Sequence, residues 1–150
     1  MQNRKIVMLE AAPEKKMVLS PEYSNRVSAL SPSTVGLLSK IGAWDIMQAA
    51  RVSPVMKMRV WDACSKAGIV FGDDRDSQVE PLSYLVENDV TVKALTDVLD
   101  GCDNLEVRYG ARVKEYHLPS KEDTESRPKV ELEGGDSILT PLLVGADGFR

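Results

Sequence analysis

Glu10 is the first residue whose type and place suit a nucleotide ligand. It follows residues 5–9, a run that is apolar after Lys5 and that predicts a buried parallel strand. In dinucleotide-binding folds, an acidic side chain at the carboxyl end of such a strand accepts a hydrogen bond from a ribose hydroxyl. Glu10 is therefore a candidate ribose-binding residue. The alternative interpretation is a solvated glutamate in a loop.

Arg26 lies in a polar segment, residues 23–27, just before a predicted helix. A guanidinium can donate two parallel hydrogen bonds to a pyrophosphate, which the ammonium of a lysine cannot do. The residue is a candidate for binding such a group. The alternative is an ordinary surface arginine.

Asp147 is flanked by glycines in the sequence Gly-Ala-Asp-Gly, residues 145–148, directly after the apolar residues 142–144. Glycine at the end of a strand lets the backbone approach a ligand closely. Asp147 and Gly148 are therefore candidate ligand-binding residues, and the alternative is a tight turn with a solvated aspartate.

Acid–base and metal chemistry find less support. His117 is the only histidine, and the two cysteines, Cys64 and Cys102, lie far from each other and from it. This spacing does not fit a zinc site, and no carboxylate stands at an obvious distance along the chain from His117. We predict no metal and assign no catalytic residue. When a bound cofactor carries out the reaction, the protein mainly binds and orients the cofactor and the substrate.

Two helices are predicted to position these candidates. One begins after Ser31 and Pro32, which are typical of an N-cap and a first helical position, and ends at Gly42. The other begins at Asn88 or Asp89 and ends at Gly101. We expect Glu10 and Arg26 to face a common crevice near the amino end of this second helix, where unpaired N–H groups favour anions.

The remaining pattern predicts strands and two polar loops. The loops are residues 73–81 and 119–128, and the strands are residues 5–9, 55–63, 69–71, 82–86, 105–109, 113–118, 130–132 and 139–144. We expect residues 55–63 and 69–71 to pair antiparallel. Residues 5–9 and 139–144 are expected to lie in one parallel layer that helices cover on both faces. The fold class is α/β, with a nucleotide-binding parallel sheet and an attached antiparallel sheet.

Composition limits the possible partners. The chain has 150 residues, of which 43% are hydrophobic and 28% are charged, as in an ordinary globular domain. A net charge of -4 gives no basic surface for a phosphate backbone, so we expect no nucleic-acid partner. The longest apolar runs have the length of strands, and the first residues show neither a signal nor a transit pattern.

Taken in order, six segments resemble one family. They resemble the FAD-dependent monooxygenases of ubiquinone (coenzyme Q) biosynthesis, mitochondrial type, in the p-hydroxybenzoate-hydroxylase-like group of flavoproteins. The segments with tryptophan and the Glu-Asn pair at residues 87–88 resemble the ubiquinone branch, and the Gly-Ala-Asp-Gly turn is similar to that of the wider group. The six segments are residues 5–11, 23–32, 41–45, 60–64, 84–90 and 143–148.

The resemblance implies a cofactor and a set of residues that bind it. The cofactor is FAD, with Glu10 at its adenosine ribose, Arg26 near its flavin and diphosphate, and Asn88 as a further polar contact. Asp147 and Gly148 match a fingerprint associated with FAD and the reduced pyridine nucleotide. Residues 1–150 would form an incomplete FAD-binding domain of Rossmann-like type, in which roughly residues 53–86 belong to the antiparallel sheet on the substrate side.

The resemblance also implies an activity, hydroxylation of the aromatic ring of a polyprenylated ubiquinone precursor. It further implies a ferredoxin-type electron donor, other coenzyme Q biosynthesis proteins as partners, and peripheral association with the matrix side of the mitochondrial inner membrane. The glycine-rich loop and the carboxyl-terminal Gly-Asp segment of the family are absent from these 150 residues. We therefore expect an internal piece of a longer protein that is inactive alone.

Two other interpretations remain open. The chain could be a truncated, non-catalytic isoform that acts as an interaction module of the coenzyme Q biosynthetic complex. It could also be an unrelated nucleotide-binding domain that uses another cofactor. Flavin content separates the monooxygenase from these two interpretations, because a yellow protein that releases FAD on denaturation would favour the monooxygenase. A colourless protein that captures coenzyme Q proteins would favour the interaction module.

Overall fold

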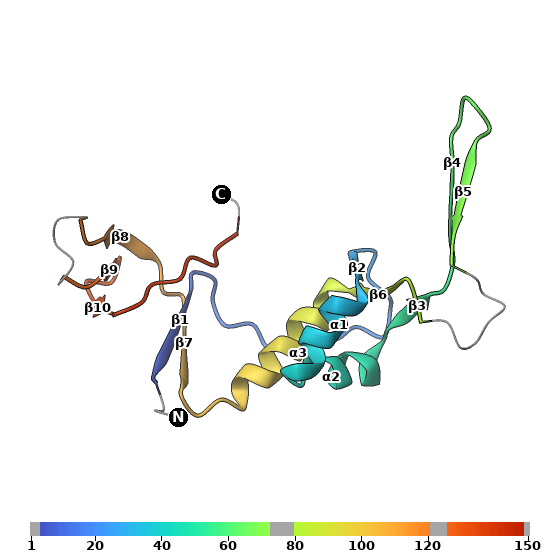
Figure 1. Ribbon diagram of the computed structural model, residues 1–150. Coiled ribbons are helices and arrows are strands. Elements are labelled where there is room, and N and C mark those ends of the chain that lie inside the picture. Colours follow the sequence, from blue (N-terminus) through green and yellow to red (C-terminus); the bar gives the residue numbers. More distant parts are fainter. Residues whose placement is uncertain (1–3, 73–79, 121–125, 149–150) are drawn as a thin grey trace. The chain divides into compact units, whose positions relative to one another are not determined.

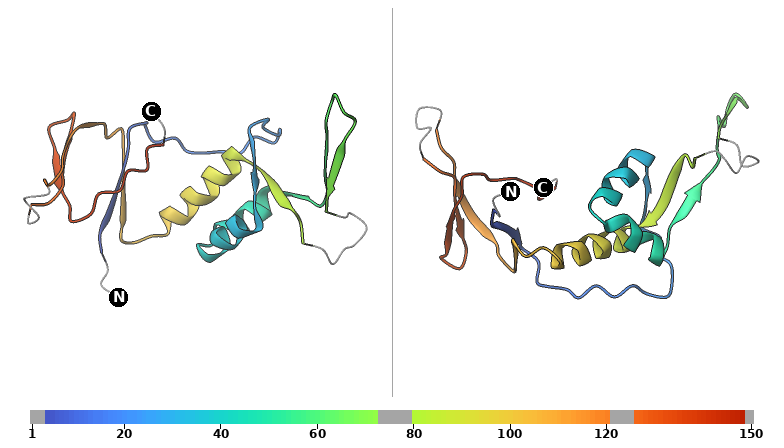
Figure 2. Two further views of the ribbon diagram at one scale, coloured as in Figure 1. Left: turned by 45° about the horizontal axis from the view of Figure 1, so that its top comes forward. Right: turned by 60° about the horizontal axis from the view of Figure 1, so that its bottom comes forward.

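The chain forms two compact units in the computed structural model, which describes residues 4–72, 80–120 and 126–148. The first unit combines Met1–Lys15 with Asn104–Arg150, so it draws on segments that are far apart in the sequence. The second unit is Lys16–Asp103. Figures 1 and 2 show the elements of each unit, coloured along the sequence.

A parallel pair of strands opens the first unit. β1 (Ile6–Glu10) runs parallel to β7 (Leu105–Tyr109), with Glu10 opposite Tyr109. The predicted parallel strand is thus confirmed, but its predicted burial on both faces is wrong. Ile6 remains 53% exposed, because β7 is the only strand paired with β1 among the described residues and this unit has no described helix to cover the pair.

An antiparallel sheet completes the first unit. Its strands follow the order β10 (Ser137–Leu139), β9 (Lys129–Leu132) and β8 (Val113–His117). The prediction that residues 139–144 share a parallel layer with residues 5–9 is wrong, since β10 ends at Leu139 and pairs antiparallel with β9. Pro141 has no N–H to donate to a ladder, which disfavours continuation of the strand.

The second unit packs helices against a three-stranded antiparallel sheet. β6 (Ser83–Glu87) is the central strand, between β2 (Val27–Leu30) and β3 (Ser53–Val55). The helices are α1 (Pro32–Lys40), α2 (Ala43–Ala50) and α3 (Asn88–Asp100). Their shared core consists of Leu38, Ala43, Trp44, Met47, Val86, Val90 and Ala94.

Local chemistry explains the helix boundaries. The Ser31 hydroxyl accepts a hydrogen bond from Thr34 N–H at 3.3 Å and caps α1, as predicted. Gly42, at φ +79°, both ends α1 and caps α2, a left-handed position that suits glycine. No helix was predicted after Gly42, so α2 was missed. Trp44 of α2 packs edge-to-face against Tyr84, with 5.1 Å between the ring centroids.

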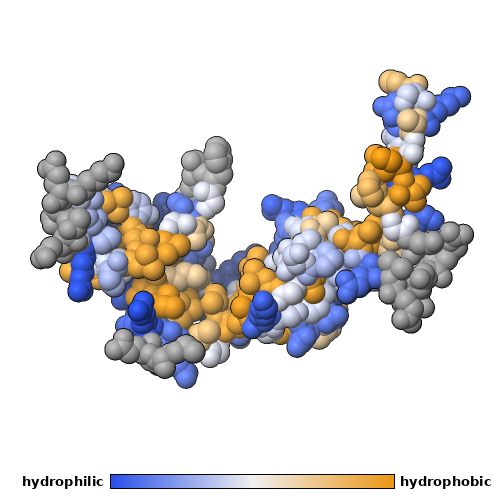
Figure 3. Space-filling view, viewed as in Figure 1, coloured by the Kyte–Doolittle hydropathy of each residue, from blue (hydrophilic) through white to orange (hydrophobic). Residues whose placement is uncertain are grey.

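A β-hairpin stands apart from this core. β4 (Met58–Trp61) pairs antiparallel with β5 (Gly68–Phe71), which confirms the predicted antiparallel pair. The single strand predicted over residues 55–63 is wrong, because Val55 belongs to β3, which pairs with β6. All of its residues are exposed, and hydrophobic residues gather over it in Figure 3. The register places four apolar side chains, each about half exposed, on one face: Met58, Val60, Ile69 and Phe71.

Some predictions fall on residues outside the described ranges. These are most of the predicted loop 73–81 and the middle of the predicted loop 119–128. Among the described residues, the longest helix has 13 residues, and none has both the length and the apolar character that a membrane span needs.

Candidate functional site

Arg26 and Asn88, two of the predicted cofactor-binding residues, lie next to each other in the second unit. Asn88 N–H donates to the Arg26 carbonyl oxygen at 2.9 Å. This contact extends the β2–β6 ladder by one step, at the point where β6 ends and α3 begins. The Asn88 side chain is fixed as well, because its Oδ1 accepts a hydrogen bond from Ser28 Oγ at 2.7 Å.

The Arg26 side chain suits an anionic ligand. It is exposed, and among the described residues its guanidinium makes no hydrogen bond or ion pair. Its donors therefore remain available for a phosphate, which a guanidinium can bind at two points. The adjacent amino end of α3 adds N–H groups that carry partial positive charge.

Glu10, Asp147 and Gly148 belong to the first unit. Glu10 is at the carboxyl end of β1, as predicted, and its Oε1 accepts a hydrogen bond from Ala12 N–H at 2.7 Å. Asp147 is exposed, and Gly148 has φ +74°, which suits glycine. A common crevice for Glu10 and Arg26 would join residues of different units, so it stays a prediction.

Glu87, which precedes Asn88, is a buried charge that was not predicted from the sequence. Only 5% of it is exposed. Its carboxylate faces Arg51, with Oε1 at 2.9 Å from Nε as an ion contact and Oε2 accepting a hydrogen bond from Nη2 at 3.2 Å. Oε2 also accepts a hydrogen bond from Ser24 N–H at 2.8 Å. The last residue of β6 is thus tied to two other segments of the unit.

Arg51 extends this network into the segment before Arg26. Its Nη1 donates to the carbonyl oxygens of Ser20 and Pro21, at 2.9 and 3.3 Å. Its guanidinium also lies 5.0 Å from the centre of the Tyr23 ring, a cation–π contact. Arg51 therefore holds residues 20–24 against the β6–α3 junction, and nothing in its sequence context signalled this role.

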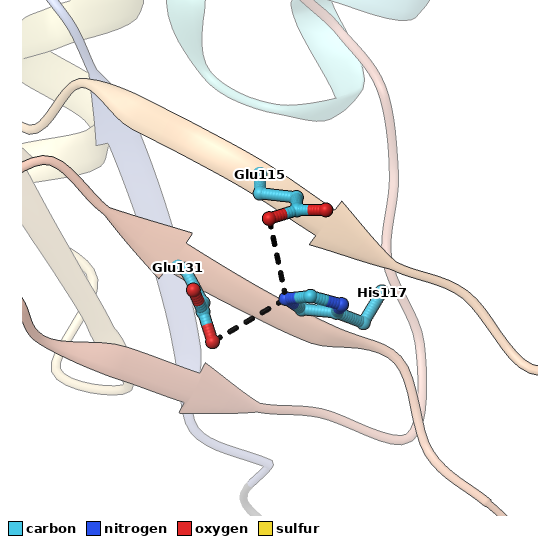
Figure 4. A group of neighbouring side chains, drawn as sticks. All are labelled: Glu115, His117 and Glu131. Carbon is cyan, nitrogen blue, oxygen red and sulfur yellow. Dashed lines mark ion pairs between the residues drawn. The ribbon is translucent and has the colours of Figure 1, made fainter.

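His117 has acidic neighbours that the linear spacing concealed. Its Nε2 lies 3.3 Å from Glu131 Oε1 on the adjacent strand and 3.9 Å from Glu115 Oε2 on its own strand (Figure 4). The interpretation that no carboxylate accompanies His117 is therefore wrong. Alternation along β8 and pairing with β9, rather than helical spacing, bring the three side chains together.

Comparison with known proteins gives a consistent result. No protein-family model matches the chain. The chain is 46% identical, over 150 residues, to the mitochondrial ubiquinone biosynthesis monooxygenase COQ6 of Danio rerio. The matched segment covers 97% of this chain and 31% of that protein. It is 31% identical, over 143 residues, to 3-demethoxyubiquinol 3-hydroxylase of Escherichia coli, covering 95% of this chain and 35% of that protein. The chain spans about one third of the length of these relatives.

Solved structures share its fold. PqsL of Pseudomonas aeruginosa, a probable FAD-dependent monooxygenase, superposes with a TM-score of 0.68 at 16% identity, over 98% of this chain and 36% of PqsL. PieE, a flavin-dependent monooxygenase in complex with FAD and substrate, gives a TM-score of 0.68 at 12% identity, over 99% of this chain and 27% of PieE. These likenesses confirm the predicted α/β fold of FAD-binding type. The resemblance seen in the sequence is confirmed too. Nearly the whole chain is similar to a segment that makes up about one third of the length of each ubiquinone biosynthesis monooxygenase compared.

Proposed function

We propose that this chain is part of the FAD-binding region of a monooxygenase that hydroxylates the aromatic ring of a polyprenylated ubiquinone precursor. The observation that carries the proposal is the 46% identity, over 97% of the chain, to the Danio rerio ubiquinone biosynthesis monooxygenase. Because the chain corresponds to about a third of that relative, we propose that it does not catalyse the reaction alone.

FAD is proposed as the cofactor, and the geometry of the second unit supports this choice. Arg26 presents unpaired donors beside the amino end of α3, and these suit a diphosphate. The Asn88 amide, held by Ser28, would add a polar contact. Bound FAD would supply the redox chemistry that activates oxygen, and these residues would bind and orient it.

The first unit is proposed to contribute the remaining cofactor contacts. Glu10 has one carboxylate oxygen that accepts no hydrogen bond from the described residues, and such an oxygen suits a ribose hydroxyl. Asp147 and Gly148 would lie beside the cofactor, with the left-handed backbone of Gly148 admitting a close approach.

Residues 1–150 are thus proposed to form part of an FAD-binding domain, with roughly residues 53–86 on the substrate side. The exposed apolar face of the β4–β5 hairpin supports the second assignment, because a polyprenylated substrate needs an apolar surface.

The location and the partners are proposals as well. The vertebrate relatives are named as mitochondrial, which supports a mitochondrial location. We further propose the matrix side of the inner membrane, peripheral membrane association, a ferredoxin-type electron donor and contacts with other coenzyme Q biosynthesis proteins.

A segment exchange tests the proposed function. In the Danio rerio monooxygenase, the matched segment is replaced by this chain, and the chimaera is produced in cells that lack their own enzyme. The expected result is a yellow protein that releases FAD on denaturation and restores ubiquinone synthesis. A folded, colourless chimaera without activity would contradict the proposal.

A second candidate is a non-catalytic interaction module of the coenzyme Q biosynthetic complex. The observation that favours it is the same exposed hairpin face, which could bury apolar area against a protein. Capture of coenzyme Q biosynthesis proteins by the colourless 150-residue chain, lost when Val60 and Ile69 are changed to Thr, would support this candidate.

A further inference from the structure

The antiparallel sheet of the first unit carries a group of metal-ligand side chains that the proposed function does not use. Glu115 and His117 are two residues apart on β8, so they share a face of the sheet. A register shift between Val113 and Glu115 places Glu115 directly opposite Glu131 of β9. Like charges directly opposite each other destabilise an antiparallel pair. The bulge therefore creates a place where a cation would be favourable.

The distances within this group suit one ion. The His117 nitrogen and one oxygen of each glutamate all lie within 4.8 Å of one another. Two ligands of a tetrahedral zinc, at bond lengths of about 2.1 Å, are separated by about 3.4 Å. The two distances from His117 Nε2, 3.3 and 3.9 Å, are already close to that value. Small side-chain rotations would bring Glu115 and Glu131 to the same separation.

The donor set has a clear chemical preference. One imidazole nitrogen and two carboxylate oxygens are ligands of borderline divalent ions such as Zn²⁺, and three protein ligands leave a position open for water. All three side chains reach solvent, with Glu131 the least exposed at 30%. An ion can therefore enter without any movement of the backbone.

One lysine competes with such an ion. Lys129, opposite His117, donates a hydrogen bond from Nζ to Glu131 Oε1 at 2.6 Å. The Lys129 ammonium thus occupies one of the carboxylate oxygens that an ion at this site would need. A bound metal would have to displace the Lys129 ammonium, which limits its affinity.

We propose that Glu115, His117 and Glu131 form a binding site for a divalent transition-metal ion of the Zn²⁺ type, with Lys129 as its competitor. The proposal does not depend on the flavin, because the three residues belong to one sheet and none of them is a candidate cofactor residue. It concerns binding in this chain, and the metal has no part in the proposed hydroxylation.

Titration of the 150-residue chain with Zn²⁺ in a calorimeter tests the site. Cys64 and Cys102, both exposed and free, are first changed to Ser so that neither thiol binds the ion. The expected result is one Zn²⁺ per chain. His117→Ala and Glu131→Gln should each weaken binding at least about tenfold, since even loss of a group that only supports a ligand costs about 10- to 100-fold.

Lys129→Gln is the variant that separates a metal site from a simple network of surface charges. Removing a positive charge about 4 Å away should tighten Zn²⁺ binding about fivefold. Co²⁺ should give a visible absorption band that His117→Ala abolishes. Absence of Zn²⁺ binding, or binding that is unchanged in His117→Ala, would overturn the proposal.

Discussion

Arg51, the residue that follows α2, and Glu87, the residue that precedes α3, form a two-point ion pair that is almost fully buried on the glutamate side. The pair joins the end of one helix to the start of another. Through Ser20, Pro21 and Ser24 it also holds the segment that leads to Arg26. The Arg51–Glu87 pair is not itself a candidate cofactor contact, but it positions the two candidate cofactor residues Arg26 and Asn88.

Breaking this pair on one side should destabilise the second unit. In Arg51→Met the Glu87 carboxylate is left buried without its partner, which should lower the free energy of unfolding by about 3 kcal/mol. The double variant Arg51→Met, Glu87→Gln should recover part of this loss, because no buried charge remains. Urea unfolding, followed by the fluorescence of the buried Trp44, measures both.

The control for this experiment is an ion pair of the same unit that solvent reaches. Lys93 and Asp97 lie one helical turn apart on α3, with Nζ and Oδ2 separated by 2.6 Å. Lys93→Met should cost no more than about 0.5 kcal/mol. Equal losses in Lys93→Met and Arg51→Met would show that burial does not strengthen the Arg51–Glu87 pair.

Arg26 should affect flavin retention more than folding. In the chimaera, Arg26→Lys should weaken FAD binding about tenfold, because an ammonium cannot copy a two-point contact with a diphosphate. The free energy of unfolding should change by no more than about 0.5 kcal/mol, since the side chain is exposed. FAD content after dialysis and urea unfolding are the two measurements. Arg59→Lys, at an exposed arginine of the hairpin, is the matched control and should retain FAD.

Asp147→Ala should give different results in two proteins. In the chimaera it should reduce flavin content or the rate of flavin reduction, with little effect on folding. In the 150-residue chain it should be almost silent, within about 0.5 kcal/mol of unfolding free energy, because the side chain is exposed. Thermal melting of both proteins decides the matter: an equal loss of stability would identify Asp147 as a structural turn residue.

Glu106 should make the first unit sensitive to acid. Hydrogen bonds from Lys5 and Arg108 lower its pKa from 4.5 to about 2. A carboxyl group whose pKa is lowered by folding stabilises the folded state above pH 4.5, and that stabilisation is lost as the pH falls towards 2. The melting temperature of the chain should therefore exceed that of Glu106→Gln at neutral pH, and the difference should shrink between pH 4.5 and 2.

Lys5→Met is the internal control for this pH dependence. It removes the larger of the two hydrogen bonds that lower the pKa of Glu106. The melting temperature of Lys5→Met should therefore exceed that of Glu106→Gln by less than the melting temperature of the unchanged chain does, and this smaller difference should depend less on pH. A difference that persists unchanged at pH 2 would mean that the charge of Glu106 does not stabilise the fold.

Local signals in the sequence predicted the elements that depend on local chemistry. Ser31 and Pro32 located the start of α1, and the polar pair after β6 located the start of α3, because caps and first turns act over a few residues. The β4–β5 pair followed from its two short apolar runs. These features need no knowledge of the rest of the chain.

Features that depend on long-range pairing could not be read in the same way. β2 was missed because its residues, next to the polar segment of Arg26, carry no strand signal apart from their partner β6. The Arg51–Glu87 pair joins residues 36 positions apart. Glu131 became apparent as a neighbour of His117 only through the pairing of β8 with β9, in which a β-bulge sets Glu131 opposite Glu115.

The direct passage from β6 into α3 has a consequence for the length of the chain at this point. Glu87 is both the last residue of the strand and the N-cap of the helix, so no loop separates the two. One inserted residue would turn the start of α3 by about 100° about its axis. It would carry Asn88 away from Ser28 and Arg26, whereas substitutions would leave the direction of the helix intact. The length of this junction is therefore constrained by geometry, in addition to the constraint that the buried Arg51–Glu87 pair places on residue 87.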